Sequence, residues 1–405
     1  MVITDVLGVL YAPHKAFKKI VEKPRYLGVV IILVLFIAVQ TGYYASYYSK
    51  INYEQTYPGT ESLNTWTTTN ATAWVTTQGT VINQNYDDFI NQTYSGNSSL
   101  QFSLDNTNSL SMALEDFGSS VNAASDGFRN LSISIKLAEP NVAPQNAMLT
   151  LYSLGGTSSF FQLDITSELS SNIGEWNNLT IPVETLDWQS TGQANWSDIT
   201  GIKLDLTYPS AANVTVNLQN LFFRGNYQTI IESSGATLFA ASAIQSTLIQ
   251  FLFQWIVLTA VIYLILKVLK APAFVWKPLF VATGFVLIVL VMTSLIGLVA
   301  TFTLPVVHYP YEFPPYASLI YPDFYVAQVS AQSQATYNAI VASTVVFTSI
   351  STAITVILYI WQVLLVSTLI RAISGFGWVK SLAAAAGSVV LTILILGLLA
   401  SIGLL

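Results

Sequence analysis

The stretch "YAPHKAFKKIVEKPRYLG", residues 11–28, runs directly into the apolar stretch "VVIILVLFIAV", residues 29–39, and this junction decides the fold. A secretory signal peptide has an apolar core of about 7–15 residues, followed by a small-residue cleavage site. Here the apolar stretch continues to Ala45, close to the roughly 20 residues with which a helix crosses the hydrocarbon layer. It ends in the tyrosine-rich "GYYASYYS", which suits a membrane interface and has no A-x-A site. The pattern predicts an uncleaved membrane helix over residues 26–47.

The composition extends this prediction to the whole chain. Of the 405 residues, 53% are hydrophobic and only 9% are charged, whereas about 25% of an ordinary soluble domain is charged. Four further apolar segments follow, each long enough to span a bilayer. They lie at about 237–266, 278–302, 340–370 and 381–404. The sequence therefore predicts an integral membrane protein with five membrane helices, residues 229–405 holding the last four.

Lys and Arg in the short loops give the orientation. The segment 1–25 holds Lys15, Lys18, Lys19, Lys23 and Arg25, and the other predicted inner loops hold Lys267, Lys270, Lys277, Arg371 and Lys380. The loop from 303 to 333 has no Lys or Arg. We therefore expect a cytoplasmic N-terminus and an external C-terminus. In segment 1–25, the pattern predicts a basic amphipathic helix that begins near Pro13 and anchors to anionic lipid through its lysines.

The charge divides unevenly between the two sides. The predicted inner segments hold 10 basic and 2 acidic residues, and the rest of the chain holds 5 basic and 19 acidic ones, for a net charge of −6. An acidic exterior without a basic patch excludes nucleic acid as a partner. The chain has no Cys, so no disulfide framework stabilises the external part. A surface of uncharged polar groups loses little when carboxylates are protonated, which suits an acidic, hot habitat and an archaeal cell surface.

Seven N-x-S/T sequons all fall within residues 48–236, where the orientation predicts an external domain. They begin at Asn70, Asn91, Asn97, Asn130, Asn178, Asn195 and Asn213. Their confinement agrees with a glycoprotein at the cell surface.

From residue 100 to 228 the hydrophobic period is two. Leu131, Ile133, Ile135 and Leu137 alternate with polar neighbours, and about eight such runs are separated by Gly, Ser, Asn and Pro. Strict alternation is typical of strands with one buried face, and this many short strands indicate an antiparallel sandwich. Residues 48–99 lack the pattern and are expected to form a polar stalk with one or two strands. The predicted fold class is thus mixed: a five-helix membrane bundle plus an extracellular all-β sandwich.

The stretches "GEWNNLTIPVETLDW", residues 174–188, and "ITGIKLDLTYPSAANVTVNLQNLFFRG", residues 199–225, resemble the galactose-binding-like jelly rolls of carbohydrate-binding modules. The resemblance covers about residues 100–226 and implies a jelly roll, with a glycan or a protein as ligand. Three tryptophans are candidates for stacking on sugar rings, namely Trp176, Trp188 and Trp196. Four charged residues on outward strand faces are further candidates, namely Lys136, Asp164, Lys203 and Asp205. An alternative interpretation remains open, in which the tryptophans fill the sandwich ends and the charges are solvated.

The opening segment also resembles the start of the Yip-type membrane domain. In that family a cytoplasmic "P-x-x-x-F-x-x-I" helix and a Pro precede the first of five membrane helices, and Pro13, Phe17, Ile20 and Pro24 match this spacing. The resemblance implies a five-helix bundle in which the jelly roll is an insertion between the first and second helices. That large insertion departs from the family's compact domain.

No Asp, Glu, Lys, Arg or His lies inside the apolar spans, which argues against a pump or proton-coupled transporter. Gln254 and Gln362 are interpreted as interhelical hydrogen-bonding groups. The external loop 303–337 is rich in Pro and aromatic residues. It offers a contact surface for a partner or packs against the external domain, and its candidate contact residues are Tyr309, Tyr311, Phe313 and Tyr316. His308, Glu312 and Asp323 have no recognised metal-ligand spacing, so we predict neither a metal site nor a cofactor.

Common enzyme motifs such as G-x-S-x-G, H-E-x-x-H and the P-loop are absent from the sequence. We therefore expect a non-enzymatic surface protein that binds envelope glycans or proteins, or serves as an accessory subunit of a larger membrane complex. Its expected partners are the lipid bilayer and an envelope glycan or another surface protein. Two alternatives remain open: a permease-like component for a lipid or small solute, and a carboxylate-dependent glycosidase.

Overall fold

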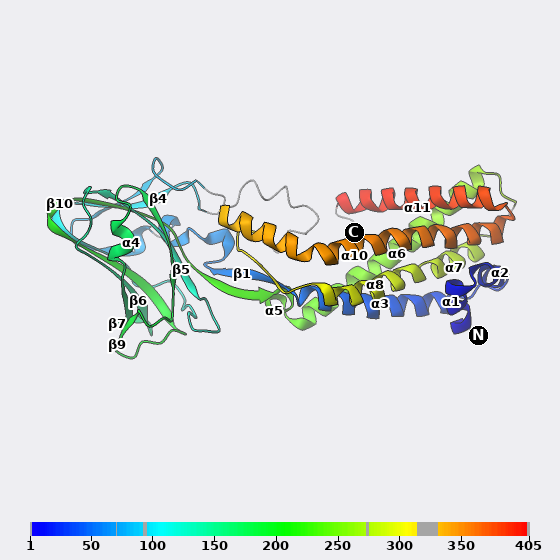
Figure 1. Ribbon diagram of the computed structural model, residues 1–405, viewed down its shortest axis with the longest axis horizontal. Helices are drawn as coiled ribbons and strands as arrows, with labels where there is room; N and C mark the ends of the chain where they lie inside the picture. Colours follow the sequence, from blue (N-terminus) through cyan, green and yellow to red (C-terminus); the bar gives the residue numbers. More distant parts are fainter. Residues whose placement is uncertain (1, 70, 92–94, 273–274, 314–330, 403–405) are drawn as a thin grey trace. The chain divides into compact units, whose positions relative to one another are not determined.

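The computed structural model describes residues 2–69, 71–91, 95–272, 275–313 and 331–402 (Figure 1). The described residues divide into two compact units. The helical unit comprises residues 1–52, 229–307 and 340–405, and the β unit comprises residues 53–228 and 308–339, in both cases as far as they are described.

Five helices of the described chain are long and apolar enough to cross a membrane, as the sequence predicts. They are α3 (Tyr26–Tyr48), α6 (Ala236–Val268), the continuous pair α7 (Trp276–Val286) and α8 (Ile288–Ala300), α10 (Ala331–Ser374) and α11 (Trp378–Ser401). Helix α10 begins well before the expected start at residue 340, within the segment assigned to the external loop. Shorter helices are α1 (Val2–Tyr11), α2 (Pro13–Glu22), α5 (Ile230–Ser234) and the turn η4 (Thr301–Thr303).

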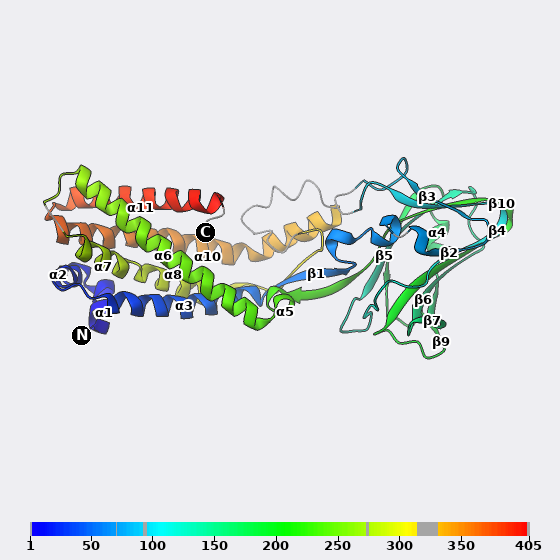
Figure 2. The ribbon, with the colours of Figure 1, turned by 180° about the vertical axis from the view of Figure 1, so that it is seen from behind.

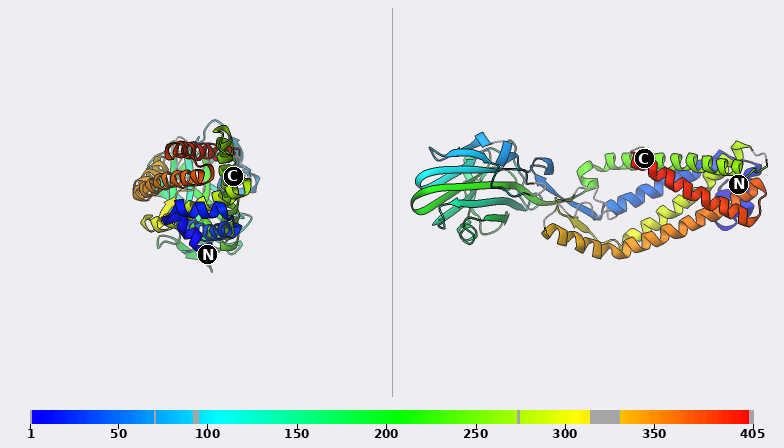
Figure 3. Two further views of the ribbon diagram at one scale, coloured as in Figure 1. Left: turned by 90° about the vertical axis from the view of Figure 1, so that its right-hand side faces the viewer. Right: turned by 90° about the horizontal axis from the view of Figure 1, so that it is seen from above.

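Small residues let α3 and α7 approach closely. A Cβ atom on Gly28 would lie 2.1 Å from Cζ of Phe285, and one on Gly284 would lie 2.6 Å from Cγ1 of Val29. Each glycine thus receives a side chain from the other helix, which is how helices associate where lipid gives no hydrophobic driving force. In Figure 2 the long helices of this unit lie alongside one another, and α6 also packs against α11, a contact visible in Figure 3.

Helix α2 was expected to bury its apolar face in the lipid headgroup layer. In the structure, other helices of the protein cover that face. Phe17 is fully buried and Ile20 is 3% exposed, because α1 and α7 pack against α2. All five basic residues of this segment remain exposed, as lipid anchoring requires; they are Lys15, Lys18, Lys19, Lys23 and Arg25. Lys19 also pairs with Asp5 of α1.

The β unit is built from antiparallel strands. They are β1 (Ile51–Tyr57), β2 (Trp74–Thr76), β3 (Val81–Asn85), β4 (Ser99–Leu114), β5 (Asn130–Glu139), β6 (Asn146–Ser153), β7 (Gly156–Asp164), β8 (Trp176–Pro182), β9 (Gln189–Thr191), β10 (Ile199–Thr229) and β11 (Val307–Tyr309). Four short helical elements complete it: η1 (Thr60–Ser62), η2 (Thr65–Thr69), η3 (Ala71–Ala73) and α4 (Thr166–Ser170).

The long strand β10 joins the two faces of the sandwich. Its first part lies between β6 and the end of β4, and its later part lies between β5 and the start of β4. The register to β4 shifts between Thr207 and Val214, a segment that contains Pro209. Strands change sheets at such irregularities, and a Pro is tolerated there because no ladder N–H is needed. Beyond this sandwich, β1 pairs with β10, and β11 with β1.

The alternation seen in the sequence forms the core of the β unit. Leu131, Ile133, Ile135 and Leu137 are at most 2% exposed, and so are the inward residues of β6 and β10.

The segment 48–99 is expected to be a polar stalk with one or two strands, but its described residues from 53 onward belong to the β unit. Trp66 and Trp74 join its core, where Trp66 stacks on Phe117 with ring centroids 4.1 Å apart. The Nε1–H of Trp74 donates to the carbonyl of Trp66 at 2.9 Å. Trp66 lies in the short helical element η2 and Trp74 opens the three-residue strand β2, so neither belongs to a run long enough to show period-two alternation.

The Tyr208→Phe substitution tests the packing of this core. Tyr208 is 2% exposed, and its hydroxyl has no hydrogen-bond partner among the described residues. An unsatisfied buried polar group costs about 1–3 kcal/mol, so we expect the substitution to raise the free energy of unfolding. Burial raises the pKa of Tyr208 from 10.0 to about 12. The free energy of unfolding is therefore unaffected by this titration below pH 10 and falls as the pH rises from 10 to 12, where only the unfolded state has released the proton.

We expect the phenylalanine variant to lose less stability across that alkaline window, measured by chemical unfolding of the full chain between pH 7 and 12. The control is Tyr86→Phe, because Tyr86 is 60% exposed. A Tyr208→Phe variant less stable than the parent at pH 7 would contradict this assignment.

Candidate functional site: a polar cleft in the β unit

A bidentate ion pair lies at the centre of the candidate site. Nε of Arg224 on β10 is 2.8 Å from Oε1 of Glu54 on β1, and Nη2 of Arg224 is 3.1 Å from Oε2 of Glu54. The Glu54 side chain is 1% exposed and the Arg224 side chain is 26% exposed. Burial lowers the pKa of Arg224, but the hydrogen bonds and charge of Glu54 offset this and leave the pKa raised. The guanidinium is therefore permanently charged and held in one orientation.

The aromatic segment 308–313 packs onto this ion pair. The backbone N–H of Tyr311 donates to Oε2 of Glu54 at 3.2 Å, and the Tyr311 ring lies 4.9 Å from the Arg224 guanidinium. Tyr309 stacks on Tyr53 at 5.3 Å, and Phe313 stacks on Tyr337 at 5.0 Å. For these three aromatic residues the sequence left open a partner contact or packing against the β domain, and in the structure they pack within the β unit. Tyr309 and Phe313 are at most 2% exposed.

The loop between β4 and β5 forms one wall of the cleft. Nη2 of Arg129 donates to the carbonyl of Ser125 at 2.6 Å. Gly225 has φ +87°, and a Cβ there would lie 2.6 Å from Nδ2 of Asn130. Glycine is therefore needed at position 225 both for its backbone conformation and for the space that Asn130 occupies.

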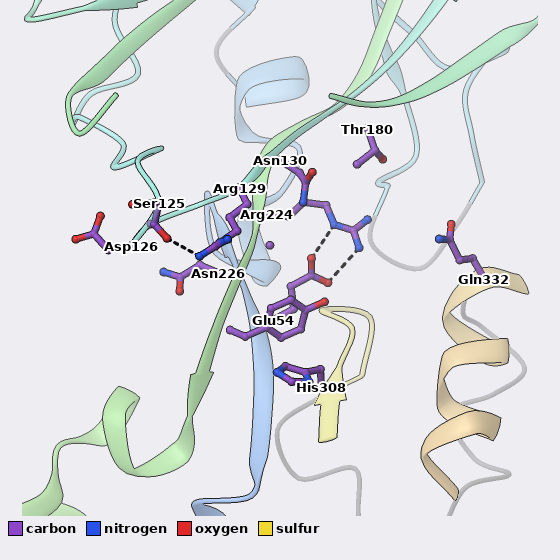
Figure 4. Close-up of a pocket in the computed structure, with 13 residues that line it drawn as sticks. Glu54, Ser125, Asp126, Arg129, Asn130, Thr180, Arg224, Asn226, His308 and Gln332 are labelled. Atoms are coloured by element: carbon purple, nitrogen blue, oxygen red, sulfur yellow. Dashed lines mark hydrogen bonds and ion pairs between the residues drawn. The ribbon is translucent and has the colours of Figure 1, made fainter. Parts of the chain in front are cut away.

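Together these residues enclose an open cleft of about 790 Å³ (Figure 4). Its wall is formed mainly by hydrogen-bonding side chains: Glu54, Ser125, Asp126, Arg129, Asn130, Thr180, Arg224, Asn226, Tyr227, His308 and Gln332. These residues come from β1, β5, β8, β10, β11, α10 and the loop before β5, so the cleft exists only in the folded β unit.

Tyr227 gives the cleft an accessible aromatic ring. It is 40% exposed, and His308 lies edge-on to it with ring centroids 4.9 Å apart. Burial and the charge of Glu54 raise the pKa of Tyr227, while Arg224 lowers it in part. The phenol therefore stays protonated at neutral pH and keeps its O–H donor beside an apolar ring face.

Two of the predicted tryptophans fill the sandwich. Trp188 is 7% exposed, and its Nε1–H donates to the carbonyl of Pro182 at 2.9 Å. Trp196 stacks on Phe161 at 3.8 Å and meets Trp188 edge-on. For these two residues the structure agrees with the packing interpretation rather than with sugar stacking.

Trp176 lies on the outer face, within a polar cluster. Its Nε1–H donates to Oδ1 of Asp88 at 3.1 Å, and Nζ of Lys136 lies 2.8 Å from Oδ2 of the same carboxylate. Asn217 also donates to Asp88, at 3.1 Å. Through these contacts Asp88 holds the segment after β3 against β5, β8 and β10 on this face. On the other outer face, Lys203 pairs with Asp205 at 2.7 Å, and Asp164 accepts hydrogen bonds from the backbone and side chain of Thr166, which lower its pKa.

The described sequon residues Asn91, Asn97, Asn178, Asn195 and Asn213 are exposed, whereas Asn130 is half-buried in the cleft wall. Glycosylation of these sites stays a prediction. Three residues of the sequence analysis lie outside the described residues, namely Asn70, Tyr316 and Asp323.

No family model matches the chain, and no curated protein is similar to it. Solved structures match part of the chain. The chain is similar to a family 11 carbohydrate-binding module from Clostridium thermocellum in complex with a β-1,3-1,4-mixed-linked tetrasaccharide, at 10% identity and a TM-score of 0.26, over 37% of this chain and 86% of that one. It is also similar to a family 30 carbohydrate-binding module, at 12% identity and a TM-score of 0.28, over 44% and 91%. A β-1,2-glucanase from Parabacteroides distasonis is matched at 14% identity and a TM-score of 0.28, over 37% and 22%.

The central residues of the cleft were not among the candidates from sequence. Glu54 and Arg224 are lone charges in otherwise uncharged strand segments, "INYEQTY" and "NLFFRGNY". A charged residue that the strand pattern places on the buried face needs an ion-pair partner. This requirement was the signal in the sequence that pointed to Glu54 and Arg224. Which two charges pair across a separation of 170 residues follows only from the fold.

Breaking the ion pair tests its role in the β unit. Glu54→Gln leaves Arg224 charged and without its counterion, and removing one partner of a buried pair costs about 3–5 kcal/mol. Because Arg224 is partly exposed, we expect a loss near 3 kcal/mol, measured by chemical unfolding of the full chain.

The double variant Glu54→Gln with Arg224→Met should lose less than the sum of the two single variants. Lys203→Ala is the control, because its pair with Asp205 is 32% exposed on both sides and such pairs contribute about 0–1 kcal/mol. Equal losses for Glu54→Gln and Lys203→Ala would contradict a structural role for the buried pair.

Proposed function

We propose that this protein is a non-enzymatic membrane protein whose β unit binds envelope glycans outside the cell, with the polar cleft as the binding site. The observation that carries the proposal is the exposed ring of Tyr227 in a wall of fixed hydrogen-bonding groups. A sugar presents C–H faces and many hydroxyls, so it matches an aromatic ring flanked by amides and guanidinium groups.

The chemistry of the wall favours a polyhydroxylated ligand over an apolar one. Sites for apolar small molecules are lined mainly by hydrophobic side chains with few polar groups, and this cleft has the opposite composition. Both of its arginines are already engaged, Arg224 by Glu54 and Arg129 by the carbonyl of Ser125. The remaining donors and acceptors of Asn130, Asn226 and Gln332 are uncharged, which suits hydroxyl groups.

The same contacts support binding rather than hydrolysis. A glycosidase needs two carboxyl groups about 5–10 Å apart, one acting as an acid and the other as a nucleophile or base. In this cleft both oxygens of Glu54 accept hydrogen bonds from Arg224, and one also accepts from Tyr311. Glu54 is therefore held as a counterion. Asp126, the other acidic residue of the wall, accepts from Asn122 at 3.1 Å.

The arrangement of basic groups supports the proposed orientation. The basic residues of α2, of the α6–α7 connection and of the α10–α11 turn gather at one end of the helical unit (Figure 1). Nζ of Lys380 reaches the carbonyl of Leu269 at 3.5 Å, which links two of these turns. This end would face the cytoplasm under the positive-inside rule, and the chain enters the β unit from the opposite end of α3.

A glycan array with the full-length protein in nanodiscs tests the proposal. The protein is produced in a bacterial host without N-glycosylation, so that Asn130 carries no glycan of its own. We expect selective binding to a subset of glycans, without release of reducing ends. Tyr227→Ala should weaken the binding of the best ligand about tenfold, and Asn226→Ala about fivefold, since one lost hydrogen bond is worth about 1 kcal/mol.

Asn146→Ala is the matched control, because Asn146 is exposed on β6 and does not line the cleft. Unchanged affinity in the Tyr227 and Asn226 variants would place the site elsewhere. If the protein bound none of the glycans on the array, this result would contradict glycan binding.

A further inference from the structure

The helical unit contains a cavity that the proposed function does not use. It has a volume of about 770 Å³ and is lined by side chains of α6, α10 and α11, with Tyr44 of α3 at its edge. A second cavity of about 160 Å³ lies between α3, α6, α8 and α10. Gln250 lines both cavities, so the two adjoin inside the helical unit.

Three glutamines converge on the larger cavity. Gln250 and Gln254 come from α6, and Gln362 comes from α10. Gln362 is only 4% exposed, and its side-chain amide makes no hydrogen bond within the described part of the chain. The sequence suggests that Gln254 and Gln362 hydrogen-bond between helices, but the structure turns both toward the cavity. By contrast, Gln40 in the smaller cavity is hydrogen-bonded to Ser294.

The buried amide of Gln362, without a hydrogen-bond partner among the described residues, calls for a ligand. Burying an amide without a hydrogen bond costs about 1–3 kcal/mol in proteins, and no bulk water is present in the hydrocarbon layer to offset it. Ser246 and Thr392 add hydroxyl groups to the same wall, while Ile393 and Leu396 form an apolar side. The cavity therefore offers one polar region and one apolar region, which is the pattern of an amphiphile.

The charge of the wall selects the head group. None of the described residues lining either cavity is ionisable apart from tyrosine. A phosphate or ammonium group would have to be desolvated here without a counterion, at a cost of several kcal/mol. Hydroxyl groups lose much less hydration free energy on burial than charged groups do. A hydroxyl can also accept a hydrogen bond from the N–H₂ of an amide and donate one to its C=O.

We propose that this cavity binds a bilayer lipid with an uncharged, hydroxyl-rich head group, whose polar part contacts Gln250, Gln254 and Gln362 and whose chain lies along α11. This inference does not depend on ligand binding by the β unit. It assigns the helical unit a binding role in addition to membrane anchoring.

Native mass spectrometry of the full-length protein from nanodiscs tests this inference. The probes are monogalactosyldiacylglycerol and phosphatidylglycerol, present in equal amounts in one bilayer, and the measurement is the ratio of the two lipids retained. We expect the galactolipid to be retained about tenfold over the phospholipid. Gln254→Leu combined with Gln362→Leu should abolish this preference, because two hydrogen-bonding groups are replaced by apolar groups of similar size.

Gln245→Leu is the matched control. Gln245 lies on the same helix α6 and is exposed outside the cavity, so the control should keep the preference. Gly397→Phe gives an independent test, because a Cβ at Gly397 has no atom within 4 Å and the new ring would fill the cavity. We expect it to reduce retention of both lipids. Equal retention of the two lipids by the parent, an unchanged preference in the double glutamine variant, or unchanged retention of both lipids in Gly397→Phe would overturn the proposal.

Discussion

The ion pair between Glu54 and Arg224 is the interaction on which the candidate site depends. Removing two charges from water costs several kcal/mol per ion, and only good geometry with further hydrogen bonds compensates this cost. Here the carboxylate receives two bonds from Arg224 and one from the backbone of Tyr311, while the Tyr311 ring covers the guanidinium. One interaction thus joins β1, the end of β10 and the aromatic segment, which are far apart in the sequence. The groups around it keep fixed positions, which is what a binding cleft for a polar ligand requires.

The helical unit satisfies a different constraint. Its apolar spans contain no ionisable side chains other than tyrosine, so their polar side-chain groups are amides, hydroxyls and indole N–H groups. Close packing through Gly28 and Gly284 holds α3 against α7, whereas α6, α10 and α11 enclose the polar cavity. The bundle therefore combines a tightly packed side with an open side. The β unit and the helical unit each bring uncharged hydrogen-bonding groups to a site, and in both cases hydroxyl-bearing ligands fit that chemistry.

Periodicity predicted most of the architecture, because long apolar runs and strict alternation reflect the solvent that each segment meets. The helices and the strands around Leu131–Leu137 were identified in this way. The described residues of 53–98 were not, since Trp66 and Trp74 bury their rings from elements of three to five residues, which are too short to show a period. The site was predicted least well. Trp188 and Trp196 proved to be packing residues, and the cleft around Arg224 and Tyr227 depends on pairings between distant segments that local patterns do not encode.

In the proposed orientation, the cleft-bearing β unit lies outside the cell and the basic segment lies inside. The chain has no Cys, so single-cysteine variants can be labelled with a membrane-impermeant maleimide without background. The two positions are Asn146 on β6 and Lys18 on α2, both of which are exposed. The account predicts that Asn146→Cys reacts in intact cells, whereas Lys18→Cys reacts only after permeabilisation. Labelling of Lys18→Cys in intact cells, with Asn146→Cys protected, would contradict it.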